Sequence, residues 1–229
     1  MKIAIAILIK NGDDWRLRNL LKSIRDQERK PDEIILVDGG STYLNYLKYL
    51  KVIERLEMKV IRASSACNVF HPARMLNKAL SVTKSDYMIA TDIDIIMSPN
   101  AVALAEKEFK LGNFVMCSRL DLDETSNRPT IDFIIDEWWT DKKLRKGHGS
   151  FQGVSTKWMR NIGGYCDEFR GWGFYDMYLE WLAKKKGKKW TMLNKQGVKL
   201  LHVYHEPLPY REKTSKKNQN LYYKKTRNK

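Results

Sequence analysis

The sequence predicts an α/β protein with a mostly parallel β-sheet that is covered by helices on both faces. Over the first 120 residues, strand-like segments alternate with helix-like segments, as in proteins built from strand–helix–strand units. The strand-like segments are runs of Ile, Val and Leu that are too uniform for a sheet with one wet face. In open sheets of this kind ligands bind beyond the carboxyl ends of the strands, and several informative polar residues follow directly after predicted strands.

The first half of the chain is expected to hold five strands and four helices. We expect strands over residues 3–9, 33–37, 58–62, 87–91 and 114–119, and helices over 15–26, 42–56, 73–83 and 99–111. The second half is less regular. It is expected to contain a helix within 132–143, a glycine-rich loop entering a strand over 147–155, a short helix ending at Gly163 or Gly164, and a helix from Tyr175 that stops at Gly187.

Length and composition indicate one ordered domain followed by a basic tail. The chain has 229 residues, of which 43% are hydrophobic, enough to bury a substantial core. No run approaches the roughly 18 uncharged apolar residues of a membrane span. The apolar opening is short and lacks a small-residue cleavage site, which indicates a first strand rather than a signal peptide. We therefore expect a cytoplasmic protein with a folded domain over 1–207 and a tail over 208–229.

The excess positive charge is concentrated in the tail. Of a net charge of +15, the last twenty residues supply eight Lys or Arg against one Glu. Basic residues with interleaved tyrosines suit contact with anionic lipid or nucleic acid; the alternative is a solvated, frayed terminus. A specific nucleic-acid-binding protein is disfavoured, because nearly half of the excess lies in this segment and no recognised binding motif occurs. The three widely spaced cysteines suit reduced, structural thiols.

Two aspartates at the end of an apolar strand are the first candidates for chemistry. In "YMIATDIDIIMSPN", Asp92 and Asp94 follow a run that a sheet interior would bury, and buried carboxylates are costly without a positive partner. Residues i and i+2 of a strand project to the same face, so both acids could serve one divalent cation. The alternative is a pair of exposed turn acids. A second copy, "DLD" at 121–123, lies in a polar stretch and is interpreted as a solvated loop.

Four segments, in this order, resemble the inverting glycosyltransferases of the GT-A fold. They are "EIILVDGGST", "FHPARMLNKAL", "YMIATDIDIIMSP" and "FQGVSTKWMRNIGGYCDEFRGWGFYDMYLEWLAKKKG". The similarity is to family 2 enzymes and to the beta-1,4-galactosyltransferase type, whose Gly-Trp-Gly acidic stretch is mirrored at residues 171–176. It covers most of residues 1–207 and implies a nucleotide-binding half over 1–120 and an acceptor-binding half over 121–207.

The resemblance implies that the acidic pair binds a metal ion and the diphosphate of a nucleotide sugar. Asp94 would be the direct ligand of Mn²⁺ or Mg²⁺, and Asp92 would contact the ribose or a metal-bound water. Asp38 matches the first acid of the family's V-D-D-G-S element, which reads the nucleotide base, although Gly39 replaces the second acid. The other expected donor contacts are Lys10 and Asn11 at the base, Arg74 against the donor's charge (or an ordinary helix-surface arginine), and Gly153 below the donor sugar.

The stretch "FRGWGFYDMYLEW" would carry the acceptor chemistry. Asp176 matches the family's aspartate and is expected to be the general base that takes a proton from the acceptor hydroxyl; the alternative is an N-terminal helix acid. Tyr175 replaces the family's glutamate in the acceptor site and leaves the acceptor's identity open. Trp172 is expected to stack on a sugar face, with core packing the alternative. Core packing is expected for Trp138 and Trp139.

Two histidines late in the chain offer a further metal ligand. Related enzymes place a metal-binding histidine near "HVYHEP", and we expect His205 in this role, with His202 the second choice. The two are three residues apart, so a strand would point them to opposite faces, and only a helical turn would present both.

These features together predict a metal-dependent inverting glycosyltransferase. It would transfer one sugar from UDP-hexose or UDP-N-acetylhexosamine to a hydroxyl of a glycan, lipid-linked or protein acceptor, with a lid loop over 147–153. The basic tail would add weak contact with a membrane surface. The alternatives are a catalytically weak nucleotide-sugar-binding module, because Tyr175 replaces the glutamate, and a metal-dependent nucleotidyltransferase.

Overall fold

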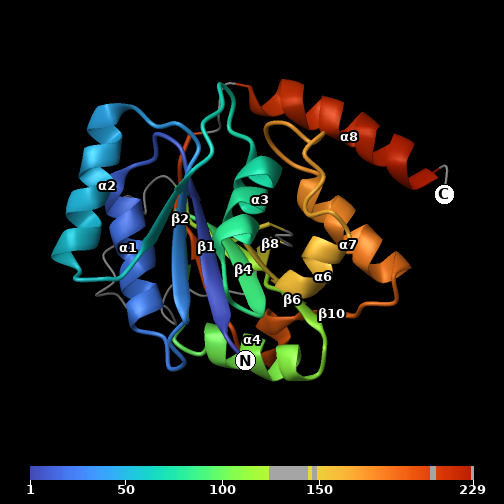
Figure 1. Ribbon diagram of the computed structural model, residues 1–229, viewed down its shortest axis with the longest axis horizontal. Helices are drawn as coiled ribbons and strands as arrows, with labels where there is room; N and C mark the ends of the chain where they lie inside the picture. The colour runs from blue at the N-terminus through green and yellow to red at the C-terminus, as the bar shows by residue number, and fades with distance from the viewer. Residues whose placement is uncertain (124–143, 146–148, 207–209, 228–229) are drawn as a thin grey trace.

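The computed structural model describes residues 1–123, 144–145, 149–206 and 210–227 (Figure 1). The expected helix within 132–143, with Trp138 and Trp139, lies outside these residues. The first two residues of the expected lid loop, 147 and 148, also lie outside them.

A seven-stranded sheet forms the centre of the molecule, in the order β10-β6-β9-β4-β1-β2-β3. Its strands are β1 (Ile3–Ile9), β2 (Glu33–Asp38), β3 (Ile61–Ser64), β4 (Tyr87–Asp92), β6 (Phe114–Met116), β9 (Phe151–Ser155) and β10 (Trp190–Met192). The run from β3 through β2 and β1 to β4 is parallel, as are β6 and β10, whereas β9 is antiparallel to β4 and β6. The predicted mostly parallel sheet is confirmed.

β2 and β4 each extend one residue beyond the predicted strands, and two other predicted strands differ more from the structure. β3 begins at Ile61 rather than at residue 58, and the strand expected over 114–119 is divided into β6 and β7 (Arg119–Asp121). The division falls at Cys117 and Ser118, where the backbone NH of Ser118 donates to the side chain of Asn194 instead of to a strand. β7 therefore leaves the central sheet.

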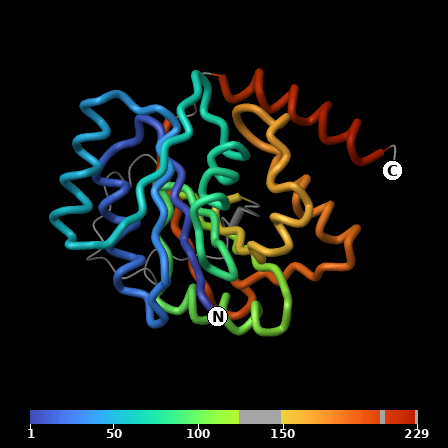
Figure 2. Tube along the Cα trace, viewed as in Figure 1, coloured from blue at the N-terminus to red at the C-terminus, as the bar shows by residue number. Residues whose placement is uncertain are grey.

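Helices cover both faces of the central sheet, as the uniformly apolar strands predicted (Figures 1 and 2). On one face pack α1 (Asp14–Arg25), α2 (Tyr43–Arg55) and α4 (Ala101–Lys110). On the other pack α3 (Pro72–Val82), α6 (Thr156–Asn161) and α7 (Tyr175–Lys185). The predicted helices of the first half and the helices beginning near residues 156 and 175 are thus all present.

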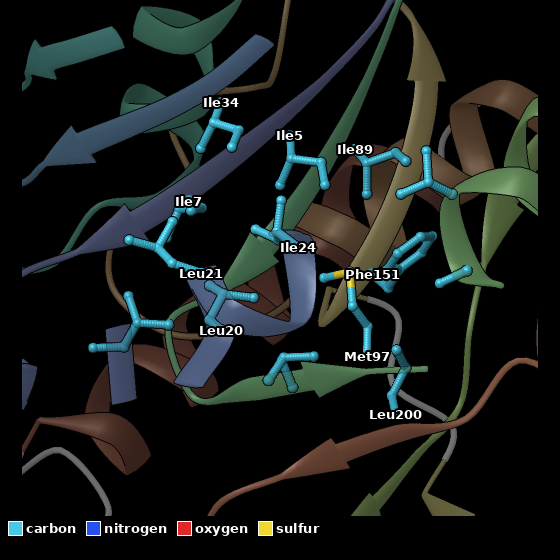
Figure 3. Packing of buried hydrophobic residues seen from close by; sticks show 14 of the residues in the cluster. Ile5, Ile7, Leu20, Leu21, Ile24, Ile34, Ile89, Met97, Phe151 and Leu200 are labelled. Carbon is cyan, nitrogen blue, oxygen red and sulfur yellow. The ribbon is translucent and has the colours of Figure 1, made fainter. Parts of the chain in front are cut away.

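The central strand β1 shows why both faces of the central sheet are shielded from water. Its odd-numbered residues are isoleucines that join the core with α1, and its even-numbered residues Ala4, Ala6 and Leu8 join the core with α3. None of the seven is more than 4% exposed. Figure 3 shows the isoleucine side, where Leu20, Leu21 and Ile24 of α1 lie against the strands. Each fully buried aliphatic side chain stabilises the fold by about 1.5–3 kcal/mol.

A second, four-stranded sheet has the order β5-β11-β7-β8. It consists of β5 (Ile95–Met97), β7, β8 (Leu144–Arg145) and β11 (Leu200–His202). β5 begins three residues after the end of β4, so this sheet starts at the carboxyl edge of the central one. β11 pairs antiparallel with β5 and parallel with β7. Residues that are distant in the sequence therefore meet at this edge.

The basic end of the chain forms helix α8 (Arg211–Arg227), which packs against α7 (Figure 1). Its Asn218 is buried, and Lys225 forms an ion pair with Glu168. The interpretation of the tail as a frayed terminus is therefore wrong for residues 211–227. None of the described helices is long and apolar enough to cross a membrane.

Glu33, at the start of β2, joins the end of α3 to the start of β4. Its carboxylate accepts hydrogen bonds from the hydroxyls of Thr83 and Ser85 and from the backbone NH of Lys84. Burial raises the pKa of Glu33, but these hydrogen bonds together outweigh burial and hold the pKa below its ordinary value. A lowered pKa stabilises the folded state above the ordinary carboxyl range. That stabilisation is lost as the pH falls through the folded-state pKa.

We therefore expect Glu33→Gln to lower the free energy of unfolding by about 1–2 kcal/mol at neutral pH. The difference from the wild type should shrink as the pH falls from neutral to about 3, because the carboxylate becomes protonated as the pH passes through its folded-state pKa. Urea unfolding at the two pH values measures this, with Glu54→Gln on the exposed face of α2 as the control. An equal loss at both pH values would contradict the role given to the carboxylate.

Candidate active site

Asp94 and two histidines form a compact cluster at the carboxyl edge of the central sheet. Oδ2 of Asp94 lies 3.1 Å from Nε2 of His205 and 3.5 Å from Nε2 of His202. The imidazole rings meet edge to face, with centroids 5.3 Å apart. One ligand atom from each of the three side chains lies within 4.8 Å of the other two. The three side chains can therefore share one cation.

The antiparallel pair β5–β11 brings these residues together. His202, the last residue of β11, pairs with Ile95, the residue that follows Asp94. The backbone NH of Val203 donates to the carbonyl of Asp94. Because the strand ends at His202, the chain turns, and His205 returns to the same side. The alternation along a strand therefore does not separate the two histidines, because the strand ends before His205, and both contact Asp94.

Asp121, interpreted from the sequence as a solvated loop acid, is part of this cluster. Its Oδ1 lies 3.2 Å from Nδ1 of His202 and accepts a hydrogen bond of 2.8 Å from Nε of Arg119. Arg119 also donates to the hydroxyl of Ser150, just before β9. The sequence did hold a signal: Arg119 and Asp121 are i and i+2, so a strand extended to residue 121 would have put both on one face.

Burial and charge act together on the acids of the cluster. Burial raises the pKa of Asp92, and the neighbouring charge of Asp94 raises it further, to about 7. Burial also raises the pKa of Asp94, but the two histidines outweigh this effect and hold the pKa of Asp94 well below its ordinary value. Burial lowers the pKa of His202, whereas Asp94 and Asp121 raise it, to about 9 overall. In the protein alone, protonated histidine therefore balances buried carboxylate.

The cluster fits a divalent metal ion. Oδ1 of Asp94 is buried without a hydrogen-bond partner in the described part of the chain, and such an atom is costly to leave unpaired. A metal ion on this carboxylate would satisfy Oδ1 and take the place of the histidine protons. Two imidazole nitrogens with one carboxylate suit Mn²⁺ better than Mg²⁺, which prefers oxygen ligands. The predicted ligands Asp94 and His205 thus lie together, with His202 as a third.

We expect Asp121→Asn to weaken Mn²⁺ binding by about 10–100-fold, because a carboxylate on the far nitrogen of a metal-binding imidazole orients the ring and raises its basicity. Isothermal titration with Mn²⁺ alone measures this. Asp86→Asn, at the start of β4 and the opposite edge of the sheet, is the control. An Mn²⁺ affinity equal to that of the wild type would show that Asp121 does not support His202 as a metal ligand.

Lys10, predicted to contact the nucleotide base, lies directly after β1. Its Nζ donates to the carbonyl oxygens of Gly39, Gly40 and Cys67. The ammonium therefore joins the loops that follow β2 and β3. This contact gives Lys10 a structural role at the expected nucleotide end of the sheet.

Asp38 and Asn11 shape the same loop. The carboxylate of Asp38 accepts from the backbone NH and the hydroxyl of Ser41. Asn11, in the left-handed region with φ of 52°, accepts from the backbone NH of Thr42 at the start of α2. A pocket of about 400 Å³ opens here, and its lining includes Asp38, Ser41, Tyr43, Tyr46 and Arg62.

The pocket and the metal-ion cluster lie at the same edge of the sheet. Leu8 of β1 pairs with Asp92 of β4, and Ile9 pairs with Asp38. A Cβ added to Gly12 would lie only 2.1 Å from Cδ1 of Ile93, the residue between the two aspartates. The segment after β1 therefore lies between the two groups, and a larger residue at position 12 would have to displace the end of the Ile93 side chain.

Arg74 and Gly153 are placed differently from the other predicted donor residues. Arg74 lies in the first turn of α3 with an exposed side chain. Gly153 lies within β9 between β4 and β6, where an added Cβ would come within 2.6 Å of both Phe109 and Val115. The glycine is thus explained by core packing instead of by a donor sugar. The expected lid is corrected as well, because its second part, from Phe151, belongs to the central sheet.

The predicted acceptor residues lie at the start of α7. Cβ of an alanine at Gly149 would lie 3.0 Å from Oδ2 of Asp176 and 3.1 Å from the hydroxyl of Tyr175, so both side chains reach the chain just before β9. Burial raises the pKa of Tyr175 well above its ordinary value, and the charges of Asp176 and Asp92 raise it further. Tyr175 therefore lies near both acids, which relates the start of α7 to the cluster at the end of β4.

Trp172 lies in the loop before α7 and is 39% exposed. The guanidinium of Arg211 covers one face of its ring, at 4.2 Å from the centroid. The alternative of core packing is therefore excluded by its exposure, whereas contact with a sugar stays a prediction. The contact with Arg211, a residue of the predicted tail, was not expected from local spacing.

Three solved structures share this fold. GalNAc-T7 with UDP, GalNAc and Mn²⁺ superimposes with a TM-score of 0.67 at 12% identity. The mannosyltransferase PcManGT from Pyrobaculum calidifontis with GDP-Man and Mn²⁺ gives 0.65 at 15%, and TarS from S. aureus with UDP-GlcNAc gives 0.64 at 13%. Each comparison covers 91% of this chain but only 45%, 58% and 60% of the other chain, respectively.

Comparison of the sequence with curated proteins finds no match. The profile of glycosyl transferase family 2 matches residues 5–169, from β1 to the residue before the Arg170–Phe174 segment. This match includes Asp38, Asp92, Asp94 and Asp121 and ends before Asp176 and the two histidines. It spans most of the chain. The chain therefore belongs to glycosyl transferase family 2.

Proposed function

We propose that this protein is a metal-dependent glycosyltransferase that moves one sugar from a nucleotide-diphosphate sugar to an acceptor hydroxyl with inversion. The observation that carries the proposal is the cluster of Asp94, His202 and His205 at the sheet edge that also holds the pocket beside Asp38. The Asp94–histidine cluster suits a cation, and the pocket beside Asp38 suits a nucleoside. A nucleotide-diphosphate donor could therefore be bound by its nucleoside in the pocket and by its diphosphate at the cluster.

The donor is proposed to bind with its base in the pocket beside Asp38 and its diphosphate at the cluster. Tyr43 and Tyr46 offer aromatic surface and Ser41 a hydroxyl, which suits a flat polar heterocycle. UDP-hexose or UDP-N-acetylhexosamine is the proposed donor class. The solved relatives described above are bound to UDP, UDP-GlcNAc or GDP-Man, so guanosine donors belong in the test.

The metal ion is proposed to be Mn²⁺, held by Asp94, His205 and His202. When bound, it would neutralise the leaving diphosphate as a Lewis acid. Asp121 would hold His202 with its other nitrogen toward the ion, and Arg119 would hold Asp121. Asp92, the other acid at the end of β4, would contact the ribose or a metal-bound water.

Asp176 is proposed as the general base. Its carboxylate accepts the backbone NH of Met177 through Oδ1, while Oδ2 faces Gly149. It would take the proton of the acceptor hydroxyl as the new glycosyl bond forms, on the side of the anomeric carbon away from the diphosphate. Such in-line attack inverts the configuration. Trp172, in the Gly-Trp-Gly loop directly before α7, is proposed to contact the acceptor or the transferred sugar.

Nucleotide release from a panel of UDP- and GDP-sugars tests the proposal without knowledge of the acceptor, because water can act as a slow acceptor. We expect release from at least one donor with Mn²⁺, loss of release with EDTA, and recovery when Mn²⁺ is added back. Less recovery is expected with Mg²⁺, because two of the three ligands are imidazoles. Binding of a donor without any release would favour the binding module. Release of pyrophosphate from a nucleoside triphosphate would favour the nucleotidyltransferase.

A further inference from the structure

The segment Arg170–Phe174, called here the acceptor loop, has an unusual backbone. Gly171, Gly173 and Phe174 all have positive φ, of 76°, 84° and 68°. Phe174 carries a side chain, so its left-handed conformation is strained and persists only where surrounding contacts stabilise it. This strained residue directly precedes Tyr175 and Asp176. The position of these two side chains therefore depends on what holds the loop.

Asn218 of α8 holds three of the five residues of this loop. Its side-chain amide nitrogen lies 3.1 Å from the carbonyl oxygens of Arg170 and Trp172 and 3.0 Å from that of Gly173. Asn218 is only 3% exposed, the lone buried side chain among the described residues of this otherwise polar helix. Buried amides are normally hydrogen-bonded, and the amide nitrogen of Asn218 meets backbone carbonyls of the loop.

Thr214, one helical turn before Asn218, makes a second contact with the loop. Its hydroxyl accepts a hydrogen bond of 3.1 Å from the backbone NH of Trp172. A Cβ added to Gly171 would lie within 2.5 Å of the Thr214 methyl carbon, whereas a Cβ added to Gly173 would meet nothing within 4 Å. The first glycine of the Gly-Trp-Gly sequence is therefore fitted to α8, and the second is not.

Further contacts fix α8 itself. Lys225 pairs with Glu168 on the near side of the loop, and the ring of Tyr222 lies 5.8 Å from that of Phe174. At the other end of the helix, Arg211 covers the ring of Trp172. The loop is thus held along its length by a helix that lies outside the region matched by the family profile.

We propose that α8 is a clamp on the acceptor loop and that Asn218 is a positioning residue for Asp176. The amide of Asn218 hydrogen-bonds to carbonyl oxygens of the loop. These contacts keep Phe174 in its left-handed conformation and fix the position of the first turn of α7. Trp172 and Asp176 are then presented together toward the acceptor. The catalytic part of this inference rests on the proposed function, whereas the clamp itself does not.

Asn218→Asp is the sharpest test, because it keeps the size of the side chain but sets a carboxylate oxygen against three carbonyl oxygens. Hydrogen exchange of the amides of residues 170–178 should become at least about tenfold faster in this variant. Asn220→Asp, the same change on the exposed side of the same helix, should leave these amides unchanged. If Asn218→Asp fails to fold, Thr214→Val should still accelerate exchange at Trp172, because it removes the hydroxyl that accepts from the Trp172 NH and donates to carbonyls in the first turn of α8. Unchanged exchange in both variants would overturn the clamp.

Kinetics separate positioning from simple stability. In donor hydrolysis with Mn²⁺, Asn218→Asp should lower kcat about ten- to hundredfold while KM for the donor stays within about twofold. In an Asp176→Asn background, Asn218→Asp should lower kcat no further, because both changes act through one carboxylate. Equal losses in the two backgrounds would overturn the positioning role.

The clamp and the catalytic role of Asn218 can be refuted separately. A wild-type protein that releases no nucleotide would overturn the proposed function and the catalytic role of Asn218, while hydrogen exchange would still decide the clamp. An active wild type whose loop exchanges at the same rate with and without the Asn218 amide would overturn the clamp and leave the proposed function intact.

Discussion

Asp94→Asn is expected to weaken Mn²⁺ binding by at least about a hundredfold, more than the loss expected when a residue behind a ligand is changed. Asp94 contacts both histidines through Oδ2, and its Oδ1 is buried without a hydrogen-bond partner in the described part of the chain. An amide at this position cannot provide the negative charge that balances the ion. Nucleotide release should fall to a similar extent, because the diphosphate would leave without its neutralising cation.

Titration with Mn²⁺ followed by the nucleotide-release assay measures both effects of Asp94→Asn. Asp26→Asn, an exposed acid at the far end of α1, is the matched control and should behave as the wild type. Circular dichroism would confirm that the variant is folded. A folded Asp94→Asn protein that binds Mn²⁺ and releases nucleotide normally would refute the metal centre.

Asp176→Asn is expected to lower kcat by about 10²- to 10⁴-fold, the range that general base catalysis contributes. Because Asp176 is assigned to the acceptor hydroxyl and not to the donor, the affinity for Mn²⁺ and the KM for the donor should stay near their wild-type values. This pattern is the reverse of that expected for Asp94→Asn, where binding itself is lost. The two variants together therefore separate the donor side of the site from the acceptor side.

Glu180→Gln, an acid one turn further along α7, is the control for Asp176→Asn. It should keep its activity, because its carboxylate pairs with Lys184 one turn further along the same helix. If Asp176→Asn kept the wild-type kcat while binding the donor normally, the carboxylate would be only an N-terminal helix acid.

The architecture could be predicted because the strands carry a strong local signal. β1 is a row of Ile alternating with Ala and Leu, and the structure buries both sets. Its predicted limits, 3–9, are those observed. The short strands were harder. Three-residue strands such as β5 and β11 offer too few residues for any alternation to be recognised, so the second sheet was missed.

The missed sheet is also why the candidate site was only partly predicted. Asp94 and His205 could be named from the residues and the resemblance, but the joint position of His202 and Asp121 follows from the pairing of β11 with β5 and β7. That pairing joins distant segments and leaves no trace in local spacing. Similarly, Asn218 looks like any polar residue in a basic helix. Its burial depends on where α8 docks.

Asp94 lies before the midpoint of the chain, whereas His202 and His205 come near its end. More than 100 residues must therefore be synthesised after Asp94 before the three side chains can lie side by side. The hydrophobic layers around β1 can form earlier in synthesis, because α1, β2 and α3 come soon after β1 in the sequence. The proposed metal ion could therefore bind all three side chains only after β11 has joined the second sheet, when the elements around β1 are already present.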